Sequence, residues 1–182
     1  MTIPDDNNGN TIVADEDMDV TLEVIGSGYS SSTVKSSISV DWENYHWQDE
    51  NGDNHTSYIV GVEGLSLELT LSEGSSIPVH GSAGHSSDDL QNSDNLKVYR
   101  NGDYASNLSG YDGQKSVKDF LANYIDENGR VTIDDNQVMF LMELGTTNKN
   151  NSYYDMQDVV VLATFTPSTK AELEKMIENT VR

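Results

Sequence analysis

The acidic and amide side chains of this sequence gather in three short polar segments, and oxygen-rich segments of this kind bind hard cations. In the first segment, Asp49, Asn51 and Asp53 follow the D-x-N-x-D spacing of the first three ligands of an EF-hand calcium loop. The glycine and the closing glutamate of the full loop are missing. The spacing predicts a calcium site at these residues, and an ordinary hairpin turn is the alternative because turns use the same residue types.

A second polar segment, at 126–135, directly follows a predicted helix. Its oxygen-bearing side chains are those of Asp126, Asn128, Asp134 and Asp135. The order of an acidic start, a glycine, a β-branched residue and closing acids resembles a shortened EF-hand or dockerin-like loop, and this resemblance implies calcium binding. However, two residues of the full loop are missing, and Arg130 stands close to where another oxygen ligand is expected. A helix that ends at Gly129 and continues into a tight turn is the alternative.

A third pair of acids, Asp155 and Asp158, precedes the apolar run that starts at Val159. The D-x-x-D-V-V pattern is similar to the strand entries of calcium-associated prokaryotic extracellular β-sandwich surface domains. The resemblance covers only this short segment, and it implies that both acids bind calcium. The alternative is that the acids mark the solvent end of a buried strand and prevent pairing in a wrong register.

Aromatic residues and histidines provide the remaining candidate sites. Trp42 and Trp47 could stack against sugar rings and bind carbohydrate, although aromatic side chains at a strand end more often belong to the core or its rim. His80 and His85 flank a short loop and could approach one zinc ion, but the sequence supplies no further ligands for it. We therefore expect solvated histidines.

Motifs of catalysis are absent from the sequence. It contains no G-x-S-x-G elbow, H-E-x-x-H motif, Walker loop or dinucleotide fingerprint, so we predict that the protein is not an enzyme. It also contains no cysteine, which excludes disulfides and thiolate chemistry. The sequons at Asn54, Asn107 and Asn150 would accept glycans only in a glycosylating export pathway.

The net charge restricts the partners of the chain. Among 182 residues, 31 are acidic and 10 are basic, which gives a net charge of −21. This charge argues against nucleic acid and against anionic membrane surfaces as partners. It is compatible with solubility, a salt-rich habitat or the binding of divalent cations. The sequence has no apolar run that could span a membrane and no signal peptide, so we expect either a mature extracellular chain or a virion protein.

The hydrophobic pattern predicts a mainly β protein. Two apolar runs, 138–144 and 159–165, read as central strands buried on both faces. Shorter segments alternate between apolar and polar residues, as strands with one wet face do. Helical spacing predicts an inserted helix at about 116–126 and an amphipathic C-terminal helix at about 168–180. These elements favour an antiparallel β-sandwich of immunoglobulin-like or jelly-roll type.

The domain organisation follows from these elements. We expect a flexible N-terminal arm at 1–10, a β-sandwich domain at 11–167 and the C-terminal helix at 168–182. The leading functional hypothesis is a non-enzymatic extracellular structural or adhesive subunit, which assembles with identical copies into a filament or surface layer and is stabilised by calcium. The alternatives are a virion structural protein and a carbohydrate-binding module.

Overall fold

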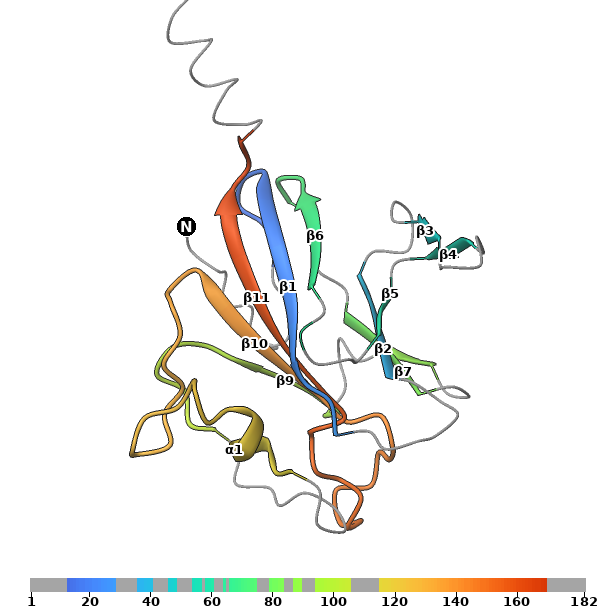
Figure 1. Ribbon diagram of the computed structural model, residues 1–182, viewed down its shortest axis with the longest axis vertical. Coiled ribbons are helices and arrows are strands. Elements are labelled where there is room, and N and C mark those ends of the chain that lie inside the picture. The colour runs from blue at the N-terminus through green and yellow to red at the C-terminus, as the bar shows by residue number, and fades with distance from the viewer. Residues whose placement is uncertain are drawn as a thin grey trace, which may run out of the picture.

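The computed structural model describes eleven stretches of the chain (Figure 1): residues 13–28, 36–40, 46–48, 54–56, 58–60, 64, 66–74, 79–83, 87–89, 94–105 and 115–169. The strands between 36 and 60 and between 79 and 89 are described by their backbone alone. Nearly all regular structure in these stretches is β, which confirms the predicted mainly β class. The elements are β1 (Met18–Gly26), β2 (Ser36–Val40), β3 (His46–Gln48), β4 (Asn54–Thr56), β5 (Tyr58–Val60), β6 (Ser66–Leu71), β7 (Val79–Ala83), β8 (Ser87–Asp89), β9 (Leu96–Tyr99), α1 (Val117–Phe120), β10 (Gln137–Met142) and β11 (Val159–Pro167).

The main structural unit is a five-stranded antiparallel sheet with the strand order β6-β1-β11-β10-β9. The two apolar runs of the sequence form β10 and β11, which pair from Gln137↔Thr164 to Met142↔Val159. Both strands lie inside the sheet, as predicted. Strand β1 pairs with β11 along its whole length and separates β11 from the edge strand β6.

The two faces of this sheet differ. One face, here called the apolar face, carries buried side chains from β1, β10 and β11: Met18, Val20, Leu22, Val24, Val138, Phe140, Met142, Val159, Val161, Ala163 and Phe165. The opposite face, here called the α1 face, is apolar over β10 and β11, where Met139, Leu141, Val160 and Leu162 pack with Val117 and Leu121. Over most of β1 and over β6 the α1 face carries exposed polar side chains, those of Thr21, Glu23, Ser66, Glu68 and Thr70. Residue alternation along each strand produces this division.

The inserted helix is much shorter than the predicted span of 116–126. Helix α1 contains four residues, and its N-terminus has the capping box that the sequence predicts, formed by Ser116 and Asp119. The helix ends at Leu121 because the chain then turns, and Ile125 forms a β-bridge with Val131. That bridge requires extended backbone at Ile125, which excludes helix there.

A four-stranded sheet has the order β5-β2-β7-β8, and β3 pairs with β4. Within the described part of the chain, the extensive contacts between elements are those between hydrogen-bonded neighbours of one sheet. The predicted sandwich is therefore not demonstrated by these contacts. The predicted arm at 1–10 lies outside the described residues, and so does the C-terminal helix from residue 170 onward. No helix in the described ranges is long and apolar enough to span a membrane.

Candidate functional site

Three acidic side chains are buried together where β10 ends and β11 begins. Glu143 is fully buried, Asp155 is 2% exposed and Asp158 is 7% exposed. We call these three residues the buried carboxyl cluster. Glu143 and Asp158 flank the loop 144–157, which connects the two strands, and Asp155 lies near the end of that loop. Buried acids are rare unless other groups compensate them, so their hydrogen bonds determine what the cluster does.

Glu143 binds both ends of the loop through its two carboxylate oxygens. Oε1 accepts hydrogen bonds from the backbone N–H of Gly145 at 2.8 Å and of Thr146 at 3.1 Å. Oε2 accepts from the N–H of Asp155 at 2.9 Å and of Met156 at 3.2 Å. One side chain therefore satisfies four backbone donors, two on each side of the loop. An apolar residue at this position would remove this acceptor from the N–H groups of Thr146, Asp155 and Met156, whereas that of Gly145 would keep its second acceptor, Asp158.

Asp158 completes the same arrangement from the β11 side. Its Oδ2 accepts hydrogen bonds from the N–H of Leu144 at 2.6 Å and of Gly145 at 3.0 Å. Burial first, and the adjacent charge of Glu143 second, raise the pKa of Asp158 from its ordinary value to about 8. Asp158 and Glu143 are also joined by a side-chain hydrogen bond. Such a bond between two carboxyl groups requires a proton, which Asp158 holds at neutral pH.

Asp155 accepts hydrogen bonds from Gln157, which is fully buried. Its Oδ2 accepts from Gln157 Nε2 at 2.8 Å, and its Oδ1 accepts from the backbone N–H of Gln157 at 3.4 Å. Between them lies Met156, whose φ of 59° is in the left-handed region that residues with a side chain seldom adopt. The hydrogen bonds on either side hold this residue in place.

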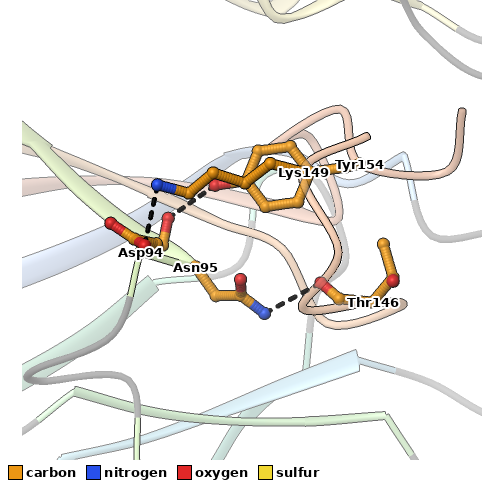
Figure 2. A network of polar contacts seen from close by, with 5 residues as sticks. All are labelled: Asp94, Asn95, Thr146, Lys149 and Tyr154. Carbon is orange, nitrogen blue, oxygen red and sulfur yellow. Dashed lines mark hydrogen bonds and ion pairs between the residues drawn. The ribbon is translucent and has the colours of Figure 1, made fainter. Parts of the chain in front are cut away.

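The loop is also bound to the turn that precedes β9, as Figure 2 shows. The ammonium of Lys149 lies 2.7 Å from the carboxylate of Asp94, and the Tyr154 hydroxyl donates to the Asp94 carbonyl at 2.6 Å. The side-chain amide of Asn95 donates to the Thr146 carbonyl at 3.0 Å. The loop 144–157 is thus held at its base by the buried carboxyl cluster and along its side by residues 94–95.

The main chemical capacity of this arrangement is to order backbone and to hold a proton. The acids at the base of the loop are engaged by N–H groups of the chain itself. Across the ranges that the structure describes, no group of three or more histidine, aspartate or glutamate side chains is arranged to hold a metal ion. No family model, curated protein or solved structure matches this chain. Its function has to be inferred from its own residues.

The sequence prediction for Asp155 and Asp158 concerned calcium binding or a solvated strand end. The structure brings the two acids together, but it buries both and turns them toward the protein. The sequence reasoning missed Glu143 and Gln157. Glu143 had a visible signal, because it is the acid within the apolar run 138–144.

The second predicted segment forms a tight turn. Asp126 Oδ1 accepts from the N–H groups of Asn128 and Arg130, both at 2.8 Å, and these bonds lower the pKa of Asp126. The Arg130 guanidinium lies over the Tyr104 ring and donates to the Gly102 carbonyl. Arg130 therefore points toward the 102–104 turn.

The other acids of this segment lie beyond the turn. Asp135 Oδ1 is 3.4 Å from Asn101 Nδ2, and the backbone N–H of Asp134 donates to Gln137 Oε1 at 3.0 Å. The structure therefore places Asp126 and Asn128 in one turn, and it engages Asp134 and Asp135 with other partners.

The remaining candidate residues are described in part or not at all. Asp49, Asn51, Asp53, Trp42 and His85 lie outside the described residues. Trp47 belongs to β3 and is paired with His55 of β4, and His80 of β7 is paired with Asp89 of β8. Only the backbone of these pairs is described, so the predicted sugar and zinc sites stay predictions.

Proposed function

We propose that this chain is a non-enzymatic extracellular structural or adhesive subunit that pairs with copies of itself through strand β6 and requires calcium to do so. The observation that carries this proposal is the position of β6 at the end of the five-stranded sheet. An edge strand presents backbone N–H and C=O groups that can pair with another chain. Pairing of two such edges would extend the sheet from one subunit to the next.

The side chains of β6 favour pairing over protection. Ser66, Glu68 and Thr70 are exposed and lie on the α1 face beside β1, whereas Leu71 is buried. The six residues SLELTL contain no proline and no lysine, two residues that commonly prevent edge pairing, and Glu68 is the charged residue among them. The strand is also long enough to form several inter-subunit hydrogen bonds.

Calcium is included because of charge. Two chains with a net charge of −21 repel each other, and edge pairing would bring the Glu68 carboxylates of two copies close together. Divalent cations at an interface offset such charge, and extracellular modules bind calcium weakly enough to use it in this way. The buried carboxyl cluster supports a non-enzymatic role, since its acids bind the protein's own backbone.

A two-layered domain is part of this proposal. The members of the apolar face come mainly from one face of a single sheet, yet Val24, Val138 and Val159 have no exposed surface. Such burial requires a layer over that face. We assign the four-stranded sheet β5-β2-β7-β8 to this layer, which gives the β-sandwich that the sequence pattern favours.

Sedimentation velocity tests the assembly. The protein is compared in millimolar calcium, in a chelator, and in sodium chloride of matched ionic strength, which screens charge without bridging it. Because pairing of β6 with β6 uses the same edge of both copies, we expect dimers in calcium and monomers in the chelator. Monomers in all three buffers would refute self-association. Equal assembly in calcium and sodium chloride would refute the calcium requirement alone.

Cysteine scanning locates the interface, because the chain has no cysteine of its own. Ser66→Cys, Glu68→Cys and Thr70→Cys are oxidised singly and in pairwise mixtures, and disulfide-linked dimers are measured on non-reducing gels. Thr21→Cys is the matched control, since Thr21 is exposed on the same face and pairs with Glu68 but lies in the interior strand β1. Crosslinking of the β6 variants no greater than that of Thr21→Cys would exclude this edge.

A further inference from the structure

A pocket of about 380 Å³ lies where β1 meets helix α1. It is on the α1 face, at the boundary between the apolar part and the polar part of that face. The volume lies in the range of small-ligand sites. The side chains that decide its chemistry are Glu23 from β1, and Lys115, Asp119, Phe120 and Tyr124 from α1 and its flanks.

An aromatic ring forms one wall of the pocket and already has a cation over it. The ammonium of Lys115 lies 5.3 Å from the centroid of the Phe120 ring, within the range of about 6 Å in which a ring face attracts a cation. The ring packs directly on the backbone of Gly26, since a Cβ atom at Gly26 would lie 2.3 Å from the ring. This contact restricts movement of the ring. The Phe120 face is therefore a preformed surface for an alkylammonium group.

Acidic and phenolic groups converge on the same space. Glu23 and Tyr124 both line the pocket, and burial first and the Glu23 charge second raise the pKa of the Tyr124 phenol. Asp119 accepts hydrogen bonds from the N-cap residue Ser116, and these bonds, with a smaller contribution from the charge of Lys115, lower the Asp119 pKa. Two carboxylates and two aromatic rings around one small volume are the groups that recognise alkylammonium ions in proteins.

We propose that this pocket binds an alkylammonium group, with the side chain of Lys115 as its occupant in the isolated chain. Lys115 is exposed and has a long flexible stem, so an external ammonium can displace it at little cost in packing. The net charge of −21 attracts cations to the surface. The site lies on α1 and the end of β1, so it stands whether or not β6 pairs with another copy.

An alkylammonium group has two sources, a small quaternary amine or a lysine side chain of another protein. Calorimetric titration of the full chain with tetramethylammonium chloride probes the first source. Titration with Nα-acetyl-lysine amide, which keeps a free ε-ammonium group, probes the second. Nα-acetyl-norleucine amide, which has a similar stem and no charge, is the control ligand. We expect at least one of the two cations to saturate a single site at millimolar concentration or below, and the control ligand to show no binding.

Two pairs of variants separate the pocket from general charge effects. Lys115→Ala removes the internal competitor, and we expect it to tighten binding about two- to fivefold. Lys118→Ala removes an equal charge from an exposed position in α1 that does not line the pocket. Glu23→Gln should weaken binding, whereas Glu127→Gln removes an equal charge from an exposed position that lies outside both the pocket and strand β6, and it should leave binding unchanged.

Each comparison of variants has a result that would overturn the proposed alkylammonium site. Equal effects of Lys115→Ala and Lys118→Ala, or of Glu23→Gln and Glu127→Gln, would show attraction by net charge alone and overturn the proposal. No binding of either cation to Lys115→Ala would overturn it as well. Thermal unfolding of each variant shows whether it is folded. The four substituted residues are exposed and each substitution is isosteric or truncating, so we expect little change in folding.

Discussion

Glu143 and Asp158 accept a hydrogen bond from the same backbone donor, the N–H of Gly145, at 2.8 Å and 3.0 Å. Burial of the Asp158 carboxyl, together with the charge of Glu143 beside it, disfavours ionisation of Asp158 and raises its pKa. The pair therefore holds one proton. Its other charged and titratable neighbours are Asp155 and, across the loop, Tyr154. This relationship makes stability depend on pH.

The first prediction concerns that dependence. The pKa of Asp158 is about 8 in the folded protein and lies near 3.8 without these interactions. Between these values the folded state binds the proton and the unfolded state does not, so the free energy of unfolding decreases as pH rises. The stabilisation is fully present below about pH 4 and is lost as pH passes through about 8. Urea unfolding from pH 5 to pH 9, in a chelating buffer, measures the decrease.

Asp158→Asn is the variant that isolates this effect. Asparagine keeps an acceptor oxygen for the N–H groups of Leu144 and Gly145 but does not titrate. In the variant, the free energy of unfolding should decrease less between pH 5 and pH 9 than it does in the wild type. Asp126→Asn is the control, because the pKa of Asp126 is lowered and its titration falls below this range. If the free energy of unfolding of Asp158→Asn decreases with pH as steeply as that of the wild type, another group binds the proton.

The second prediction concerns Glu143. Replacement by glutamine keeps the volume and one acceptor oxygen, but it directs an NH₂ group at two of the four N–H donors. Unsatisfied buried donors are costly, and we expect Glu143→Gln to lower the free energy of unfolding by about 2 kcal/mol. Urea unfolding at pH 6 measures this change. The exposed variant Glu127→Gln removes the same charge and should change stability by less than about 0.5 kcal/mol.

Sequence patterns predicted those parts of the fold that depend on neighbouring residues. The strands β10 and β11 follow from continuous apolar runs, and the capping box at Ser116 follows from residues three positions apart. The helical spacing of apolar residues overestimated the length of helix α1, because the β-bridge between Ile125 and Val131 competes with helical backbone. That competition comes from tertiary structure and is invisible to helical periodicity.

The buried carboxyl cluster could not be predicted as a unit for a related reason. Glu143 and Asp158 are fifteen positions apart, and their partners are backbone N–H groups, which every residue type carries. The resemblance of the D-x-x-D-V-V pattern implied metal ligands at the strand entry, and the hydrogen bonds that place the same acids inside the folded loop were not visible in that pattern. Glu143, an acid within an apolar run, was the residue from which a buried polar role could have been inferred.

The third prediction concerns Gly26 and Phe120. A Cβ atom at Gly26 would lie 2.3 Å from the Phe120 ring, so Gly26→Ala requires the ring to move. We expect a loss of about 1–3 kcal/mol in the free energy of unfolding. In a Phe120→Leu background, adding Gly26→Ala should lower the free energy of unfolding by less, since leucine is smaller than the phenylalanine ring and leaves more space. A double-mutant cycle by urea unfolding measures this coupling, and additive effects of the two substitutions would refute the contact.

The last prediction compares two contacts that hold the loop 144–157 against residues 94–95. Lys149 and Asp94 form an ion pair between exposed side chains, which solvent screens and salt weakens, so it contributes little to stability. Asn95 is 3% exposed and donates to the Thr146 carbonyl.

Removing the buried amide leaves that carbonyl without its donor and creates a cavity, so Asn95→Ala should cost about 1–3 kcal/mol. Hydrogen exchange of the loop amides, followed by mass spectrometry, provides the local measurement. Protection should fall clearly in Asn95→Ala and hardly in Lys149→Met. If Lys149→Met exposes the loop as much as Asn95→Ala does, the surface ion pair contributes as much as the buried amide, and the loop is held mainly by charge.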